Sequence, residues 1–425
     1  MTSPPSPPSP PPPSAPPLPT HEDQPADGGG GSGRLSRRLV LLLAVTCAVA
    51  VGNLYFPQAI SPLIAEGLHV PAGTAGLVVT TTQIGYTAGM VLLVPLGDRI
   101  RHRTLLVVLL ALTGLALLGA GCAPALPPLA AASTLVGLTT VAAQIIGPMV
   151  AGLVAPRHRG EALGTLLSGS TAGMLLARTF GGVLGEWLGW RAPYLAAAAI
   201  ALLLAAVTAY AVPVTTPPPA ARRPYLHFLA EPLRLLRAEP ELRRSCWYQA
   251  AVFGGFSAAW TSVALLLTGP VYGLGAEAVG LLALVGAVTV LCTPYAGRLV
   301  DRHGPGPVNL VCLLGVLLAA AVLAGGALGG PAGLAALSAG TLLLDVSMQS
   351  GMIANQTRVY ALRPDARSRL NTAYMTCSYL GGTAGSWLGV RAHTAYGWPA
   401  VCTLIALLTA TALTRHLVPR RPTPP

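Results

Sequence analysis

The stretch that decides the fold occurs twice in the chain. It reads Gly181-Gly-Val-Leu-Gly-Glu-Trp-Leu-Gly-Trp-Arg-Ala192 and returns 200 positions later as Gly381-Gly-Thr-Ala-Gly-Ser-Trp-Leu-Gly-Val-Arg-Ala392. Two shorter matches have nearly the same spacing, since Asp98-Arg99 is followed by Asp301-Arg302 and Gln144 by Gln349. Internal similarity at a fixed period indicates a duplicated unit, here of about 200 residues.

Each copy lies in a series of apolar runs. The chain is 53% hydrophobic and 9% charged, whereas an average soluble domain has about 25% charged residues. A membrane span needs about 20 mainly apolar residues. The runs of this kind are Leu39–Ile60, Ala75–Leu96, Leu105–Ala123, Leu129–Val154, Leu163–Leu188, Ala192–Val212, Trp247–Leu267, Val279–Ala296, Val308–Leu328, Leu334–Asn355, Leu370–Leu388 and Trp398–Thr414. We therefore expect an all-α membrane protein of about twelve transmembrane helices, built as two six-helix parallel repeats.

Composition divides the chain into five parts. Residues 1–38 are rich in Pro and Gly, bury too little apolar surface to order, and are expected to be a disordered cytoplasmic tail. The other expected parts are an N-terminal six-helix bundle at 39–212, a cytoplasmic linker at 213–246, a C-terminal six-helix bundle at 247–414 and a cytoplasmic tail at 415–425.

The basic residues predict the orientation. The net charge is +12, and the chain has Arg but no Lys. Outside the spans only Arg191 and Arg391 fall in loops on one side, and every other Arg except Arg178 falls on the opposite side. Since basic residues near spans stay in the cytoplasm, we expect a multi-pass protein of the plasma membrane with both termini cytoplasmic.

Several function classes are excluded by the same composition. The Arg clusters flank apolar runs and belong to no soluble domain that could bind nucleic acid. A phosphate-binding loop of the P-loop type needs a Lys, which the chain lacks. The seven Cys show no paired spacing typical of metal sites. We expect no enzyme activity, no metal and no cofactor.

The repeated Asp-Arg loops resemble the hallmark of the major facilitator superfamily, Gly-x-x-x-Asp-Arg-x-Gly after the second and eighth spans. The second copy keeps Gly297, Asp301, Arg302 and Gly304, and the first keeps Asp98 and Arg99 followed by Arg103. The resemblance covers nearly everything from residue 39 to 414. It implies transport by alternating access, with these loops latching the cytoplasmic helix ends through ion pairs.

Other segments resemble a bacterial group within the drug-export, proton-antiporter branch of that superfamily. They are Asn53-Leu-Tyr-Phe-Pro-Gln58, Leu175-Leu-Ala-Arg-Thr179 and Asn355-Gln-Thr-Arg-Val-Tyr-Ala-Leu362. Two features depart from that branch, because Ser133 stands where it often has an Arg, and Ala177-Arg178 stands where it has Gly-Pro.

Two opposite charges lie deep in the spans, Arg178 in the fifth and Asp345 in the tenth. A charge there costs roughly 2.5 to 3.5 kcal/mol and marks an ion or substrate path by default. We hypothesise that Asp345 carries a coupling proton, with Arg178 stabilising its ionised form or binding an anionic group. The alternatives are a static link between the halves, or an Arg178 side chain that extends towards the outer surface. Helix rise puts the two about 9 Å apart in depth, near the limit of Arg reach.

Polar and aromatic side chains are expected to line the central cavity. Gln144 and Gln349 hold equivalent positions in the two halves, and Trp260, Asn53 and Tyr55 complete the set, with Gln58 beside them. The alternative for each is hydrogen bonding between helices, which also uses polar residues in membranes.

Small residues are concentrated in the fifth span, as Gly173, Gly181, Gly182 and Gly185. Glycine lets helices approach closely in bilayers. We expect these positions to pack at a moving interface.

These patterns predict a secondary active transporter that exports a small organic compound, a drug or a metabolite, in exchange for protons. The alternatives are a proton-coupled importer of a metabolite and a membrane sensor that moves no solute. The expected partners are a small-molecule substrate, protons and the lipid bilayer, and we expect a monomer.

Overall fold

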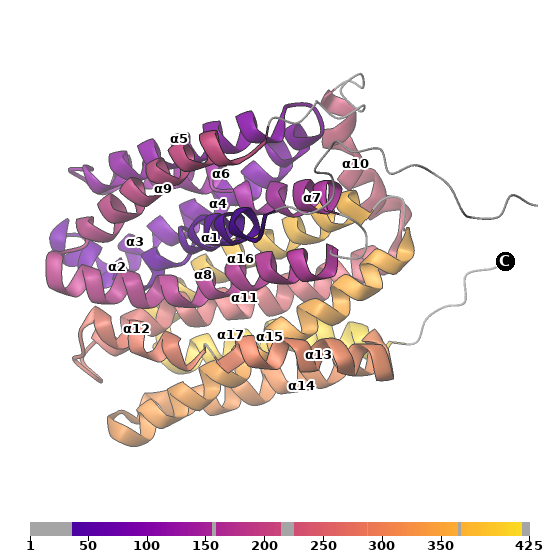
Figure 1. The fold of residues 1–425 in the computed structure, drawn as a ribbon. Coiled ribbons are helices and arrows are strands. Elements are labelled where there is room, and N and C mark those ends of the chain that lie inside the picture. Colours follow the sequence, from indigo (N-terminus) through magenta and orange to yellow (C-terminus); the bar gives the residue numbers. More distant parts are fainter. Residues whose placement is uncertain (1–35, 155–158, 214–224, 287, 364–366, 419–425) are drawn as a thin grey trace, which may run out of the picture.

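The computed structural model describes residues 36–154, 159–213, 225–286, 288–363 and 367–418. Most of the expected tails, and residues 214–224 of the expected linker, lie outside these ranges, so the predicted disorder of the N-terminal tail is untested. The described residues contain no β-strand (Figure 1). The helices are α1 (Arg37–Gly52), α2 (Phe56–Gly67), α3 (Ala72–Ala75), α4 (Leu77–Leu92), η1 (Val94–Asp98), α5 (His102–Gly121), α6 (Leu126–Thr139), α7 (Ala142–Leu153), α8 (Arg159–Leu188), α9 (Arg191–Ala211), α10 (Tyr225–Ala238), α11 (Pro240–Thr268), α12 (Ala276–Val285), α13 (Val288–His303), α14 (Pro305–Ala324), η4 (Gly325–Leu328), α15 (Gly330–Leu362), α16 (Arg367–Tyr396) and α17 (Trp398–Leu417).

Each predicted span falls on one long helix or on consecutive shorter ones. Nine helical stretches among the described residues are long and apolar enough to cross a membrane. The remaining predicted spans correspond to α8, the pair α12–α13, and α16. The helices α8 and α16 have 30 residues each, about 45 Å of helix against a hydrocarbon core of about 30 Å. The all-α membrane fold is confirmed, and the count of twelve stays a prediction.

Several of the predicted spans are made of consecutive shorter helices rather than one continuous helix. The first is interrupted between Gly52 and Phe56, where Pro57 occupies the first turn of α2, a position that needs no amide hydrogen. The fourth is interrupted at Thr140-Val141, and in the eighth α12 ends at Val285, before Gly286. Such breaks in a membrane are tolerated where protein surrounds the backbone.

The two halves use glycine in the same way. A Cβ at Gly173 of α8 would lie 2.1 Å from the Ala48 carbonyl oxygen of α1, and one at Gly381 of α16 would lie 2.1 Å from the Ala250 carbonyl oxygen of α11. Each half therefore presses its fifth helix onto its first through glycine. The predicted close approach at Gly173 is confirmed, and Gly181, Gly182 and Gly185 are similarly crowded.

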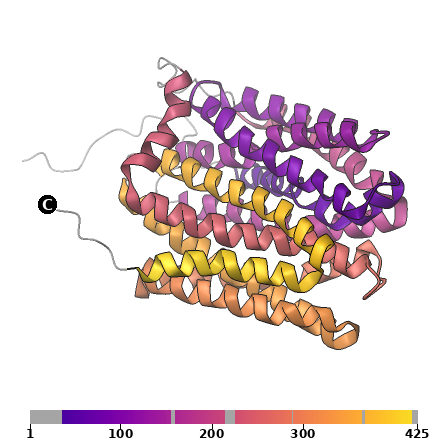
Figure 2. The same ribbon diagram turned by 180° about the vertical axis from the view of Figure 1, so that it is seen from behind.

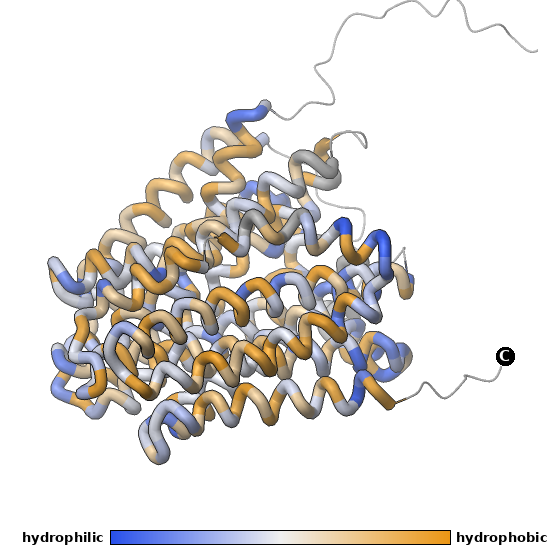
Figure 3. Tube along the Cα trace, turned by 90° about the horizontal axis from the view of Figure 1, so that it is seen from below, coloured by the Kyte–Doolittle hydropathy of each residue, from blue (hydrophilic) through white to orange (hydrophobic). Residues whose placement is uncertain are grey.

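The helices run side by side between two ends of the bundle. Figures 1 and 2 show α5 and α9 along one side and α13 and α14 along the opposite side, with α8, α11 and α16 between them. The end where α1 begins, α17 ends and α10 lies is called the tail end, and the opposite one the far end. Figure 3 shows hydrophilic residues gathered at the two ends and hydrophobic ones along the helices between them.

At the tail end, α10 occupies part of the predicted linker. It is bound to the C-terminal half by an ion pair of 2.5 Å between Glu231 and Arg369 of α16. A second pair, 2.7 Å between Glu239 and Arg363, joins the residue before α11 to the end of α15. Since α11 begins at Pro240, the helix starts seven residues before the predicted span.

At the far end, the halves contact each other directly. The Glu186 carboxylate of α8 accepts a hydrogen bond of 2.7 Å from the amide nitrogen of Ala276, the first residue of α12. The Thr179 hydroxyl donates to the Gly280 carbonyl oxygen at 2.8 Å. A Cβ at Gly182 would lie 2.5 Å from the Ala276 carbonyl oxygen. These contacts join α8 of one half to α12 of the other.

A second far-end seam joins α4 to α16. The hydroxyl groups of Thr80 and Ser386 are 3.3 Å apart, and that of Ser386 is 3.2 Å from Thr261 of α11. Further in, the Gln83 amide nitrogen donates to the Ser257 hydroxyl at 3.4 Å. These hydrogen bonds join the halves at the far end, beside a hollow of about 440 Å³ between the α3–α4 segment and α16 that is lined by Thr80, Trp387 and Arg391 among others.

Candidate functional site

The centre of the bundle holds both embedded charges. Arg178 of α8 and Asp345 of α15 are each 0% exposed, and Trp260 of α11 is also fully buried. The Trp260 indole nitrogen donates to Asp345 Oδ1 at 3.0 Å. The Arg178 guanidinium carbon lies 4.0 Å from the centroid of the Trp260 rings. One indole thus contacts the cation with its face and the anion with its N–H.

The two charges do not form an ion pair. The ion pairs of the described residues include Arg363–Glu239 and Arg369–Glu231, and none joins Arg178 to Asp345. The depth difference expected from the sequence is thus bridged by the indole of Trp260. Because an indole face attracts cations and its N–H attracts anions, Trp260 stabilises both charges without neutralising either.

The Arg178 guanidinium has further partners from both halves. Its Nε donates to Gln58 Oε1 at 2.9 Å, and its Nη1 to the Met174 carbonyl oxygen at 3.3 Å. The rings of Tyr55 and Phe256 lie 4.9 and 5.4 Å from its carbon atom. Three aromatic rings and one amide therefore enclose the cation away from lipid.

Three polar atoms of this cluster have no hydrogen-bond partner in the described structure. They are Arg178 Nη2, Gln58 Nε2 and Asp345 Oδ2. A Cβ at Gly286, where the eighth span is broken, would lie 2.6 Å from Asp345 Oδ2. Buried polar groups are normally satisfied by protein or water, so two donors and one acceptor remain available to a proton, a water or a ligand.

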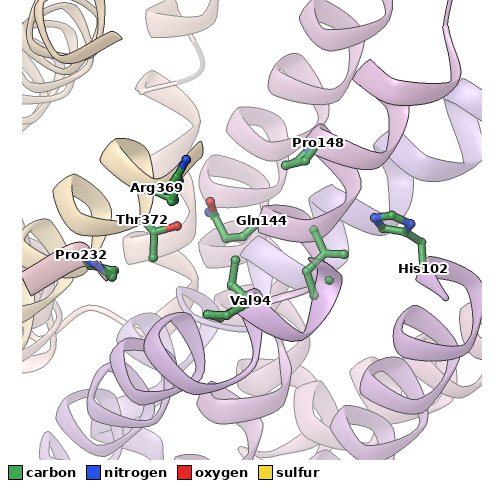
Figure 4. A pocket seen from close by; sticks show the side chains of 10 residues that line it. Val94, His102, Gln144, Pro148, Pro232, Arg369 and Thr372 are labelled. Carbon is green, nitrogen blue, oxygen red and sulfur yellow. The ribbon is translucent and has the colours of Figure 1, made fainter. Parts of the chain in front are cut away.

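A pocket opens at the tail end (Figure 4). It lies between η1, the start of α5 and α7 on one side and α10 and α16 on the other. Its polar lining includes His102, Gln144, Arg369 and Thr372. This pocket lies between the halves at the tail end, as the hollow beside Thr80 does at the far end.

The predicted cavity residues divide between these places. Gln144 lines the tail-end pocket and donates to the Tyr86 hydroxyl at 3.1 Å. Asn53 donates to the Thr140 hydroxyl at 3.3 Å, beside the break in the fourth span. Tyr55 lies against Arg178. Gln349 is 7% exposed on α15, one helical turn from Asp345.

Trp260 lies between the two embedded charges, fully buried at the centre of the bundle. The rotation of α11 points its indole at both charged helices. Its expected place on the wall of a central cavity stays a prediction.

The Asp-Arg loops lie at the tail end. Arg103 of α5 donates to the Ala209 carbonyl oxygen of α9, in the same half. Asp301 and Arg302 are exposed in the last turn of α13. Arg99 follows η1, and the side chain of Asp98 lies outside the described part of the structure. The latch between helix ends stays a prediction.

Sequence reasoning missed several contacts between the halves. Glu186 was not singled out, although it lies within the repeated stretch, where the second copy has Ser386. Both positions form far-end contacts in the structure. The signal was available in the duplicated segment, since Glu186 differs between the copies while the Gly residues, Trp187 and Arg191 do not.

Comparisons with known proteins agree with this architecture. The sequence model described as "Major Facilitator Superfamily" matches residues 41–386. The uncharacterized transporter YgaY of Escherichia coli O157:H7 is 34% identical over 371 residues, 87% of this chain and 92% of that protein. "Probable transporter SCO4007" of Streptomyces coelicolor is 34% identical over 393 residues, 91% and 90% of the two chains.

A more distant relative and a solved structure complete the picture. A protein of Streptomyces lividans named "Chloramphenicol resistance protein" is 30% identical over 286 residues, 66% of this chain and 70% of that one. The crystal structure of a bacterial homologue of the lysosomal transporter Spinster, described as inward-facing and unoccupied, has a TM-score of 0.65 at 17% identity. It covers 91% of this chain and 95% of its own, and shows the fold alone.

Proposed function

Since the chain belongs to the major facilitator superfamily, and is therefore a multi-pass membrane transporter rather than an enzyme, we propose that it exports a small organic compound in exchange for protons. The observation that carries the proposal is Asp345, a fully buried carboxylate with one oxygen held by Trp260 and the other without a partner.

Such a carboxylate suits proton coupling. It is buried at the junction of α8, α11 and α15, which come from both halves. When the Asp345 carboxylate is ionised, it interacts favourably with the Arg178 guanidinium through the indole between them. When it is protonated, the positive charge of Arg178 is no longer compensated. Each protonation state therefore favours a different arrangement of the halves, which is what coupling requires. A buried pair used only for structure would be expected to touch directly.

The position of the opening supports loading from the tail end. By the Arg distribution this end faces the cytoplasm of the plasma membrane, with both termini there. The pocket between the halves at this end, and the hydrogen bonds that join the halves at the other, support uptake of the substrate from the cytoplasm. Asp98 and Asp301 would form the opposite closure by pairing with Arg99, Arg103 and Arg302 after the halves rotate. The protein would work as a monomer, because each bundle completes the site of the other.

The name of one relative supports a broad class of substrate. The Streptomyces lividans relative is named for resistance to chloramphenicol, which favours a drug or drug-like metabolite as the exported compound. Chloramphenicol is therefore the first compound to test.

The test is transport in proteoliposomes with an imposed pH gradient. Uptake of labelled chloramphenicol into vesicles acidic inside, by molecules inserted with the tail end outward, would support antiport. Asp345→Asn should abolish the response to the gradient, whereas Glu277→Gln, which neutralises an exposed carboxylate on α12, should leave it unchanged. Accumulation only when the vesicle exterior is acidic would favour proton-coupled import. Full coupling in Asp345→Asn would refute the assignment of the proton to that residue.

A further inference from the structure

The Arg178 guanidinium and the Gln58 amide together present two free donors. Arg178 Nε donates to Gln58 Oε1 at 2.9 Å. This hydrogen bond fixes the orientation of the Gln58 amide group, which also carries Nε2. Arg178 Nη2 and Gln58 Nε2 then remain without partners, and both side chains are fully buried. Unsatisfied donors on two side chains that are hydrogen-bonded to each other are suited to an acceptor that has two oxygen atoms on one centre.

No protein group in the described structure supplies that acceptor. The Asp345 carboxylate is held through Oδ1 by Trp260 and makes no ion pair with Arg178. Its Oδ2 is instead a free acceptor beside Gly286. The cluster therefore has donors at one end and an acceptor at the other, with the faces of Trp260 and Tyr55 near the donors.

The net charge of a matching ligand follows from the coupling. An anion on Arg178 would favour protonation of Asp345, so that ligand and proton would bind together and move in the same direction. A ligand that donates a hydrogen bond to ionised Asp345 competes with the proton instead, and competition is what antiport needs. An exported ligand must therefore balance its acceptor group with a donor at the other end.

We propose that this cluster is a binding site for net-neutral compounds that carry a planar two-oxygen acceptor at one end and an N–H or O–H donor at the other. The acceptor, a nitro group or the carboxylate of a zwitterion, binds Arg178 Nη2 and Gln58 Nε2. The donor binds Asp345 Oδ2, and the flat apolar body that joins the two ends packs beside the Trp260 indole, which lies between the two charges. The proposal rests on the proposed export by proton exchange.

The probes isolate each end of such a ligand. 4-(Aminomethyl)benzoate carries a carboxylate and an ammonium group, 4-methylbenzylamine lacks the acceptor, and 4-methylbenzoate lacks the donor. 4-Nitrobenzyl alcohol tests the nitro group against the carboxylate. Binding to the full-length protein in nanodiscs is measured by saturation-transfer NMR titration at several pH values.

The wild-type protein is expected to bind at least one of the two-ended probes at least tenfold more tightly than both one-ended ones. Affinity should fall with decreasing pH, and this dependence should disappear in Asp345→Asn. Gln58→Leu removes one donor and should abolish the preference for the acceptor. Gln58→Glu gives Arg178 a carboxylate partner and should abolish it too, while keeping the buried cation paired and the protein folded.

Gln83→Leu is the matched control, because Gln83 is a buried amide of the same half that donates to Ser257 rather than to Arg178. It should keep the preference. Equal affinity for one-ended and two-ended probes, binding of neither, or an unchanged preference in Gln58→Glu would overturn the proposal. Proton-driven efflux of another compound that is insensitive to Gln58→Glu would leave the proposed function standing and remove only this site.

Discussion

Neutralising Glu186 should open the far end of the bundle. Its carboxylate accepts a hydrogen bond of 2.7 Å from the amide of Ala276 and so joins α8 to the first turn of α12. The contact exists only while the halves are closed at that end. Its loss therefore destabilises the closed state and leaves the open state unchanged.

The size of the effect follows from the chemistry of the contact. A hydrogen bond to a charged group contributes about 1.5 to 3 kcal/mol and a neutral one about 0.5 to 1.5, and Glu186 is exposed, which favours the lower values. Glu186→Gln keeps an acceptor but loses the charge near the positive end of α12. We expect a cost of about 1 kcal/mol, or about a fivefold rise in the open population. Glu186→Ala loses the acceptor as well and should cost about 1.5 kcal/mol, or more than tenfold.

Ser386→Cys reports the opening, because Ser386 is fully buried in the far-end seam. It is introduced after replacing the native cysteines, since Cys122 is exposed. The rate of labelling by a membrane-impermeant thiol reagent added to the far side measures the open population. Glu277→Gln is the control, as it removes a carboxylate from the same first turn without a hydrogen bond to α8 in the described structure.

Equal labelling rates in Glu186→Gln, Glu186→Ala and the parent would refute the reasoning. A rise of the same size in Glu277→Gln would also refute it, because the effect would then come from the charge near α12 and not from the bond across the halves.

Three further substitutions test other contacts. Trp260→Phe keeps a ring over Arg178 but leaves Asp345 Oδ1 without its donor, so we expect at least a tenfold loss of proton-coupled transport in proteoliposomes with folded protein; retained coupling would contradict this. Gly385→Leu should lower the free energy of unfolding by about 3 kcal/mol or more in a denaturation assay, because a Cβ there would lie 2.0 Å from the Gly254 carbonyl oxygen. Gly119→Ala is the control and should leave that free energy unchanged, because a Cβ at Gly119 would have no atom within 4 Å. Glu231→Gln breaks a partly exposed ion pair of α10 and should cost less than about 1 kcal/mol in a denaturation assay; a larger loss would mean that α10 supports the bundle.

The fold was predictable because its signals are local or repeated. Apolar length gives the spans, and the repeated stretch at 181 and 381 gives the two halves. Helix ends were less predictable, since α11 extends to Pro240 through polar residues that lie beyond an apolar run. The helix α10 was hidden in the linker for the same reason, because its apolar face alternates with Arg and Glu.

The two charged residues of the site could be predicted from the sequence, but the contacts that their side chains make could not. Arg178 and Asp345 stand out because ionisable residues are rare in the spans. Their arrangement depends on how α8, α11 and α15 are rotated about their axes, which a single sequence does not contain. The contacts of the Trp260 indole with both charges were therefore not predicted, and the amide of Gln58 was only a candidate among several.

The break at Gly286 ties three distant positions together. Asp345 Oδ2 occupies the space where any other residue at 286 would place its Cβ, and Trp260 holds the second carboxylate oxygen. A homologue with alanine at 286 must therefore turn its carboxylate, and with it the indole, to a different angle. The residue types at positions 260, 286 and 345 therefore distinguish homologues by the orientation of this carboxylate, independently of the substrate that each homologue transports.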